Sequence, residues 1–183
     1  MSKKVLVPIA DGIEEIEAAC IIDVLRRAGA SVTVASVDKL HVVAAHGVKL
    51  VADKLISDCT ENVYDLIALP GGMPGAERLR DSKELELMLK RQESEGRLYA
   101  AICASPAVVF QHHGLIGRRK TTCYPSFVKQ LDNTDAVESR VVVDDKCITS
   151  QGPSTALEFA LKLVEMLYGK EKAKEVALPM LAG

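Results

Sequence analysis

Short apolar runs alternate with longer amphipathic segments along the whole chain. Strands buried on both faces of a parallel sheet have nearly continuous apolar sequences. Four segments have this pattern: 3–10, 31–36, 64–72 and 98–103. Apolar residues instead recur at helical spacing in five segments, which are 13–29, 82–96, 105–114, 154–169 and 170–181. This alternation predicts an α/β fold with a doubly wound, mostly parallel sheet and helices on both faces.

Two segments have the pattern of β-hairpins. Residues 41–45 and 48–52 flank His46-Gly47, which predicts a small hairpin with a two-residue turn. The segment 139–152 predicts a second hairpin that turns at Asp144-Asp145. The chain contains no linker, repeat or low-complexity stretch, so we expect one domain spanning residues 1–183.

Charge and composition exclude several classes of protein. The net charge is −2, and acidic and basic residues are interspersed, so we expect no nucleic-acid partner. No apolar run approaches the roughly 20 residues of a membrane helix, and the first apolar run fits a strand better than a signal peptide. We expect a cytoplasmic protein, with the nucleus or a plastid as alternatives.

The cysteines and histidines favour free thiols over a disulfide framework or a metal centre. The five cysteines are irregularly spaced and form no Cys-x-x-Cys motif. No Cys/His cluster has zinc-site spacing, so we expect no metal and no cofactor. Cys20 is interpreted as a core or interface residue, Cys59 as a loop residue and Cys147 as part of a hairpin strand. His112 and His113, before Gly114, are expected at the surface.

In folds of this class, ligands bind beyond the carboxyl ends of the parallel strands. One of those ends leads to Cys103, in "AAICASP", where a strand meets a helix that begins near Ser105 and Pro106. A helix N-terminus stabilises a thiolate, so Cys103 is a candidate nucleophile. The alternative is a buried structural cysteine.

Glycines and acids follow two other strands that end at the same edge. The amides of Gly71 and Gly72 are able to face an anion, although an ordinary tight turn also explains this pair. Glu14 and Glu15 are explained by the helix dipole alone. Glu17 is expected beside the apolar stripe of the first helix, where burial raises a carboxyl pKa and fits it for proton transfer.

Four motifs in this order resemble the DJ-1 branch of the ThiJ/PfpI superfamily, the Parkinson disease-associated deglycase family. They are "DGIEEIEA", "LPGG", "AAICASP" and "TSQGPSTALEFALKLVE". The resemblance covers essentially the whole chain. "KKVLVPIADGIEEIEA" and "TTCYPSF" are most similar to one half of the tandem plant members, so the chain is either a single-domain homologue or such a half.

The resemblance implies a flavodoxin-like fold, a homodimer and a cofactor-independent reaction on small α-oxoaldehydes. Cys103 matches the nucleophilic, easily oxidised cysteine of the family, and Glu17 matches the carboxylic acid beside it. Gly71 and Gly72, with the amide of Ala104, match the oxyanion site. The activities implied are glyoxalase III chemistry, repair of early glycation adducts, redox sensing and chaperone action.

Three positions differ from patterns in the superfamily. Many members have a histidine where Cys123 and Tyr124 stand, so Glu17 is left as the base, with Tyr124, Cys123 or a group from a second subunit as possible auxiliaries. His46, a third possible auxiliary, stands where many members have an arginine near the dimer interface. Ala104 stands where the protease branch has a histidine, which argues against a protease.

Three hypotheses follow from these residues. The first is a glyoxalase or deglycase that uses Cys103 and Glu17. The second is a redox-sensing chaperone in which Cys103 is oxidised without catalysis. The third is a non-catalytic domain, which the lost histidine keeps open.

Overall fold

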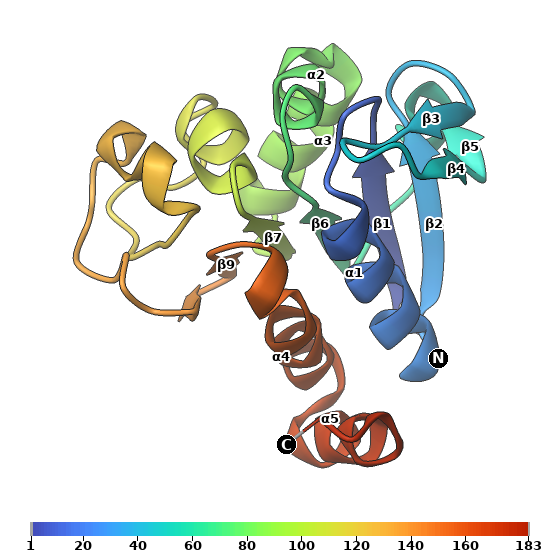
Figure 1. Ribbon diagram of the computed structural model, residues 1–183, viewed down its shortest axis with the longest axis vertical. Helices are drawn as coiled ribbons and strands as arrows, with labels where there is room; N and C mark the ends of the chain where they lie inside the picture. Colours follow the sequence, from blue (N-terminus) through green and yellow to red (C-terminus); the bar gives the residue numbers. More distant parts are fainter. Residues whose placement is uncertain (1, 183) are drawn as a thin grey trace.

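A seven-stranded sheet forms the centre of the protein, which we describe for residues 2–182 from a computed structural model (Figure 1). Its strands are β1 (Lys4–Ile9), β2 (Ser31–Ser36), β5 (Lys54–Leu55), β6 (Leu66–Leu69), β7 (Leu98–Ile102), β8 (Val141–Asp144) and β9 (Cys147–Ser150). Their order is β5-β2-β1-β6-β7-β9-β8, and all neighbours are parallel except β8 and β9. The predicted doubly wound, mostly parallel sheet is confirmed.

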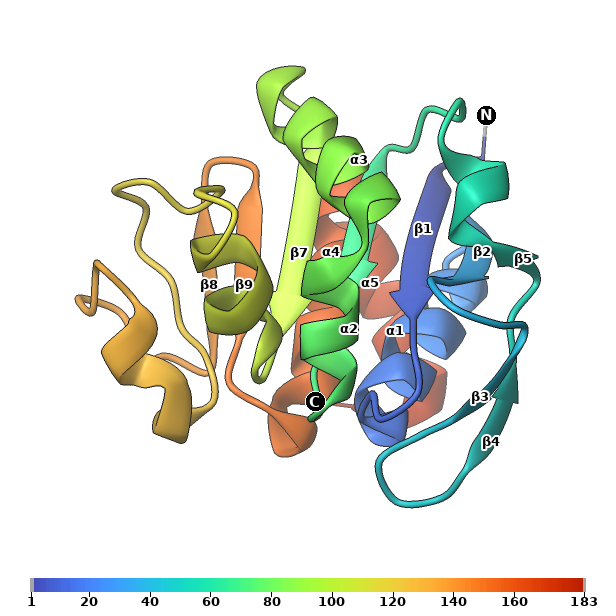
Figure 2. The ribbon, with the colours of Figure 1, turned by 90° about the horizontal axis from the view of Figure 1, so that it is seen from above.

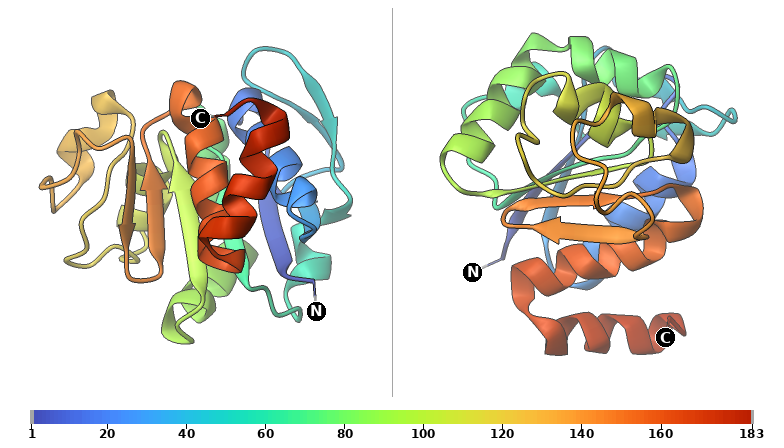
Figure 3. Two further views of the ribbon diagram at one scale, coloured as in Figure 1. Left: turned by 90° about the horizontal axis from the view of Figure 1, so that it is seen from below. Right: turned by 90° about the vertical axis from the view of Figure 1, so that its left-hand side faces the viewer.

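Helices cover both faces of this sheet, as the view from above shows (Figure 2). One face carries α1 (Glu15–Arg27) and α4 (Ala156–Tyr168), which pack side by side. The other face carries α2 (Gly75–Asp81), α3 (Lys83–Ser94) and the π-helical turn η2 (Pro106–Gln111). The last helix, α5 (Lys170–Ala177), packs on the outer side of α4 and so forms an additional layer (Figure 3).

A small antiparallel pair, β3 (His41–Val43) and β4 (Lys49–Val51), stands apart from the main sheet. The backbone joins it to the start of α1, because Ala45 N–H donates to the Ile13 carbonyl at 2.9 Å. The hairpin predicted around His46-Gly47 is therefore confirmed, and it lies against the first helix. The expected two-residue turn was wrong, because Val43 pairs with Lys49 and residues 44–48 form the connection.

The short 3₁₀ turns lie in the connections. They are η1 (Ile56–Cys59), η3 (Pro125–Gln130), η4 (Pro153–Thr155) and η5 (Leu178–Met180). Tyr99 of β7 and Phe110 of η2 are fully buried and meet edge to face, with ring centroids 5.3 Å apart. Such a pair contributes about 0.5–1.5 kcal/mol beyond its buried area, and it fixes η2 against the end of β7.

Several local predictions differ from the structure. No helix was predicted between residues 72 and 82, but α2 begins there at Gly75. Within the first predicted helix, the apolar Ile16 is exposed, whereas Glu17, Ile21 and Val24 face the core. The second hairpin turns at Asp145, which has a φ of 56°, one residue later than expected.

Candidate active site

Cys103 lies at the sharp turn between β7 and η2. Its φ of 63° is in the left-handed region, which is unfavourable for a residue with a Cβ and is found at nucleophile turns. The surrounding backbone holds this conformation: Cys103 N–H donates to the Ser150 carbonyl at 3.0 Å, and the Cys103 carbonyl accepts from Tyr124 N–H at 2.8 Å. The residue is 8% exposed. A strained, pinned and slightly exposed thiol fits a functional cysteine better than a structural one.

Glu17 reaches the same point from α1. The side chain is fully buried, and its Oε2 accepts a hydrogen bond from Gly71 N–H at 2.7 Å. Its Oε1 is buried without a hydrogen-bond partner among the described residues. Burial raises the pKa of Glu17 to about 7, and the hydrogen bond from Gly71 only partly offsets this rise. Near neutral pH the carboxyl is therefore able both to give and to take a proton.

The glycine loop after β6 passes close to both residues. A Cβ on Gly71 would lie 2.6 Å from the Cβ of Cys103, and a Cβ on Gly72 would overlap the backbone nitrogen of Glu14. Gly72 also has a φ of 87°, which side chains rarely adopt. Glycine at position 71 lets the loop approach Cys103, and glycine at position 72 lets it approach the start of α1.

The amides around the sulfur differ in part from the expectation. The N–H groups of Gly72 and Ala104 hydrogen-bond Cys103 and lower its thiol pKa. Gly71 was expected to be a third donor of this kind, but its N–H is committed to Glu17. The pair of anion-facing amides is thus Gly72 and Ala104, and Gly71 orients the carboxyl instead.

Cys103 and Glu17 are electrostatically coupled. Burial raises the pKa of the Cys103 thiol to about 12, and the negative charge of an ionised Glu17 contributes to that rise. When Glu17 carries a proton, the repulsion disappears and the carboxyl becomes a hydrogen-bond donor, so the thiol pKa falls. Ionisation of Glu17 therefore opposes ionisation of Cys103.

The three auxiliary candidates lie at different depths. Tyr124 contacts Cys103 through its backbone N–H, and its half-exposed ring lies against Gly152. Cys123 is fully buried, with Sγ 3.4 Å from the Tyr124 carbonyl oxygen, and burial raises its pKa to about 12. His46 contacts Glu14 and Glu15. Among these three, Tyr124 lies at the edge of the Cys103 turn with its ring accessible.

Glu14 and Glu15 have roles beyond the helix dipole. Glu14 is the N-cap of α1, where its Oε1 accepts from Ile16 N–H at 3.4 Å. Glu15 accepts from the backbone N–H groups of His46 at 3.0 Å and Val48 at 3.4 Å, so it fixes the hairpin to the helix. Burial acts to raise the pKa of Glu15, but these hydrogen bonds lower it overall. The sequence shows only two adjacent acids at a helix start. The helix dipole alone explains such acids, so the sequence did not reveal these contacts.

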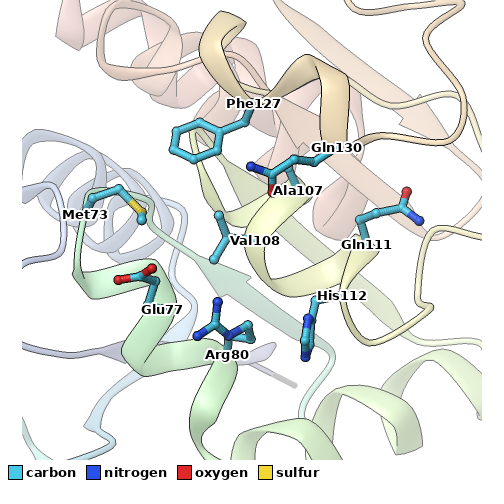
Figure 4. Close-up of a pocket in the computed structure, with 9 residues that line it drawn as sticks. All are labelled: Met73, Glu77, Arg80, Ala107, Val108, Gln111, His112, Phe127 and Gln130. Carbon is cyan, nitrogen blue, oxygen red and sulfur yellow. The ribbon is translucent and has the colours of Figure 1, made fainter.

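A hollow of about 320 Å³ lies beside the site, among α2, η2 and η3 (Figure 4). Met73, which follows Gly72, lines one side, and Glu77 and Arg80 of α2 line another. Phe127 lines it from η3 and packs against Ala104. The hollow thus shares walls with the site, while Cys103 and Glu17 are not among its lining residues.

Two of the remaining predictions for Cys and His residues need correction. Cys59 was interpreted as a loop residue but is fully buried at the end of η1. His113 was expected at the surface, yet its side chain is 8% exposed and its Nε2 lies 2.9 Å from the Arg80 carbonyl oxygen. His112 is exposed as expected.

These features define an α/β protein with a cysteine at a strand-to-helix turn, a buried carboxylic acid beside it and two backbone amides facing the sulfur. Residues 3–166 match the model of the DJ-1/PfpI family. The chain belongs to this family, which confirms the resemblance seen in its motifs.

Individual relatives are similar over most of this chain. Protein DJ-1 homolog B of Arabidopsis thaliana is 55% identical over 98% of the chain, and the match covers 41% of that protein. A Caenorhabditis elegans protein, glutathione-independent glyoxalase DJR-1.2, is 38% identical, with 98% of this chain and 95% of that protein covered. The structure of oxidized Toxoplasma gondii DJ-1 is 56% identical, covers 100% of both chains and superposes with a TM-score of 0.97.

The chain spans less than half the length of the Arabidopsis relatives, 41% of homolog B and 46% of homolog A. No helix in the described part of the chain has the length and apolar character needed to cross a membrane.

Proposed function

We propose that this protein is a cofactor-independent glyoxalase that converts methylglyoxal to lactate, and glyoxal to glycolate. The observation that carries the proposal is the buried Cys103–Glu17 pair, with a carboxyl pKa of about 7 and the amides of Gly72 and Ala104 on the sulfur. A relative named as a glutathione-independent glyoxalase supports the same reaction class.

The reaction begins with addition of sulfur to the aldehyde. The reactive state has the single shared proton on Glu17, so that Cys103 is a thiolate. Sulfur attacks the aldehyde carbon, the C–S bond forms, and the carbonyl electron pair moves to oxygen. The N–H groups of Gly72 and Ala104 then stabilise the oxyanion, which takes up a proton to give a hemithioacetal.

Glu17 then moves a proton between the two substrate carbons. Ionised after the first step, it removes the hydrogen from the carbon bonded to sulfur, which gives an enediol, and returns it to the neighbouring carbon. The hydroxyl proton on the sulfur-bearing carbon passes to the oxygen of the neighbouring carbon in the same rearrangement, so that the first carbon becomes the carbonyl of a thioester. Water hydrolyses the thioester and releases the hydroxy acid and the free thiol. Methylglyoxal plus one water gives one lactic acid, so no external oxidant or reductant is required.

Glu17 is suited to this role because Gly71 binds one of its oxygens and leaves the other without a partner. The proton is therefore carried on Oε1. A base with a pKa near the working pH is the most effective proton carrier. Ala104 follows the nucleophile, so no histidine is available there for protease chemistry.

The same chemistry extends to early glycation adducts, which release an α-oxoaldehyde or react as one. The biological consequence is protection against reactive carbonyls and oxidative stress, and we assign the protein to the cytoplasm. Formation of lactate from methylglyoxal, with a metal chelator present and no added thiol, tests the proposal.

A second candidate function is redox sensing at the same cysteine. The amides of Gly72 and Ala104 are placed to accept the oxygens of an oxidised sulfur as well as a substrate oxyanion. A relative 56% identical to this chain has been solved in a form described as oxidized. This candidate function requires that Cys103 is oxidised in preference to the other cysteines.

We also infer that the protein forms a homodimer through α1 and the β3–β4 hairpin. Four large apolar residues on these neighbouring elements are exposed: Ile16, Val43, Val48 and Val51. Large apolar side chains exposed on neighbouring elements are typical of subunit interfaces.

A further inference from the structure

Ser105 is a fully buried serine directly after Ala104, whose N–H group faces the Cys103 sulfur. A serine at the start of a helix usually accepts a hydrogen bond from a backbone N–H group of the first turn. The Ser105 side chain makes no such capping bond. Its Oγ instead donates to the Pro70 carbonyl at 2.5 Å, in the loop after β6. The hydroxyl therefore joins the nucleophile turn to the glycine loop.

The Pro70 carbonyl and the Gly71 N–H group are the two ends of one planar peptide unit. The Gly71 N–H group donates to Glu17 Oε2 at 2.7 Å. Two hydrogen bonds are therefore in series, because Ser105 donates to this peptide unit and the unit donates to Glu17. The side chains at both ends of the series are fully buried. A single peptide unit thus connects the start of η2 to the acid on α1.

Hydrogen bonds in series strengthen one another. A donor on the carbonyl oxygen polarises the whole amide, so its N–H group becomes a stronger donor, by about 10–30% per bond in condensed phases. A stronger N–H donor favours the ionised form of the carboxyl that accepts from it. The Ser105 hydroxyl also fixes the peptide plane, so that the Gly71 N–H group keeps pointing at Oε2. Both effects oppose burial, which raises the pKa of Glu17.

We propose that Ser105 is a positioning residue that controls the proton affinity of Glu17 through the Pro70–Gly71 peptide unit. It acts through the backbone and needs no contact with the substrate. The proposal rests on the proposed function for its catalytic meaning, since Glu17 is the proton carrier there, but the titration of Glu17 tests it without turnover. The alternative is a purely structural bond, which would add stability and leave that titration unchanged.

Other titratable groups also act on Glu17. Cys103 faces it from the β7–η2 turn, Glu14 precedes it at the cap of α1, and Cys20 lies on the same helix. The charge of Glu14 raises the pKa of Glu17, whereas the hydrogen bond with Cys103 lowers it. A Cys103→Ala background removes the coupled thiol and leaves the two groups on α1 unchanged. A change caused there by Ser105 then belongs to its hydroxyl.

The test is an NMR titration of the Glu17 carboxyl carbon in the Cys103→Ala protein. Adding Ser105→Ala should raise the pKa of Glu17 by about 0.2–0.5, the part of a charge-assisted hydrogen bond that the series supplies. Ser105→Gly removes the same hydroxyl and should cause the same rise. The amide proton of Gly71 should move upfield in both variants, because its hydrogen bond to the carboxyl becomes weaker.

Tyr99→Phe is the matched control. The Tyr99 hydroxyl is also fully buried and donates to a backbone carbonyl, that of Leu115, at 3.0 Å. Tyr99 lies four residues before Cys103 in the β7 strand, about 13 Å away along the chain. Its loss removes a hydrogen bond of the same kind and should leave the pKa of Glu17 unchanged. Circular dichroism checks that each variant is folded.

The pH dependence of lactate formation gives a second measurement in chains that keep Cys103. The acidic limb of the profile should move to higher pH in Ser105→Ala and stay in place in Tyr99→Phe. The proposal is overturned if both Ser105 variants titrate like their parent, or if Tyr99→Phe raises the pKa of Glu17 equally. A wild type that forms no lactate would contradict the proposed function, and the NMR titration would still decide the role of Ser105.

Discussion

Glu17 Oε2 accepts a hydrogen bond from the backbone N–H of Gly71 at 2.7 Å, inside a fully buried environment. This contact decides which oxygen of the carboxyl carries the proton, because Oε2 is already an acceptor and Oε1 has no described partner. It also joins α1 to the glycine loop after β6. The acid and one of the two anion-facing amides, that of Gly72, are therefore positioned by one backbone segment.

The raised pKa of Glu17 predicts a pH-dependent cost to stability. Between pH 4.5 and about 7 the unfolded chain releases this proton while the folded protein keeps it, so stability falls as pH rises through that range. In a Cys103→Ala background, which removes the coupled thiol, Glu17→Gln should become progressively more stabilising, by up to roughly 3 kcal/mol at pH 7–8. Urea unfolding of the two variants at several pH values measures this. A difference that does not change with pH would contradict the assignment.

Gly72 and Gly29 provide a matched pair of glycine substitutions. Both have a φ near 88°, but a Cβ at Gly29 meets open space, whereas one at Gly72 overlaps Glu14. Gly29→Ala should cost about 1–2 kcal/mol, the conformational term alone. Gly72→Ala should cost more in urea unfolding and should also lower turnover, because the loop must move away from the start of α1 and its amide then shifts relative to Cys103. Equal losses of stability and unchanged activity would mean that this close approach is not required.

Selective oxidation tests the environment of the thiol. Cys20 is more exposed than Cys103, but burial and nearby acids raise its thiol pKa, and among the described residues no backbone amide is found to lower it. Mild peroxide followed by peptide mass spectrometry should show oxidation of Cys103 before Cys20, and before the fully buried Cys59. If Cys20 is oxidised first, exposure controls the reaction and the redox-sensing candidate fails.

The proposed dimer interface predicts that a charge introduced on the β3–β4 hairpin disrupts the dimer. Val51 is 64% exposed on the hairpin, and Leu87 is 69% exposed on α3. Val51→Glu should shift the protein from dimer to monomer in sedimentation, whereas Leu87→Glu should leave its mass unchanged. A wild-type monomer, or equal behaviour of the two variants, would refute the proposed interface.

The sequence predicts elements well where local pattern and tertiary packing agree. The run 31–36 is apolar, β-branched and bounded by Gly29 and Asp38, and it matches β2 at both ends. The helix α2 was missed because its first turn contains Pro74 and Gly75, which locally favour a loop. Packing against β1 and η2 stabilises α2 as a helix. The sequence of this segment alone does not predict that packing.

The site could be predicted only in part for a related reason. Topology brings Cys103 and Glu17 to one edge of the sheet, and spacing indicates that Glu17 is buried. The partner of each amide depends on tertiary placement within a few ångströms, so the contact of Gly71 with Glu17 was not foreseen. His46 was noted as a departure from the family, but its position between Glu14 and Glu15 arises from packing of the hairpin on α1.

The central claim is that Cys103 is the nucleophile of a glyoxalase, and lactate formation tests it most directly. Wild type, Cys103→Ala, Glu17→Gln and Cys20→Ala are incubated with methylglyoxal, a metal chelator and no added thiol. Wild type and Cys20→Ala should produce lactate at similar rates. Cys103→Ala should fall to the rate of buffer alone, and Glu17→Gln should lose about 10²–10⁴-fold, the usual contribution of a proton-transfer residue. Near-normal lactate production by Cys103→Ala would contradict the account.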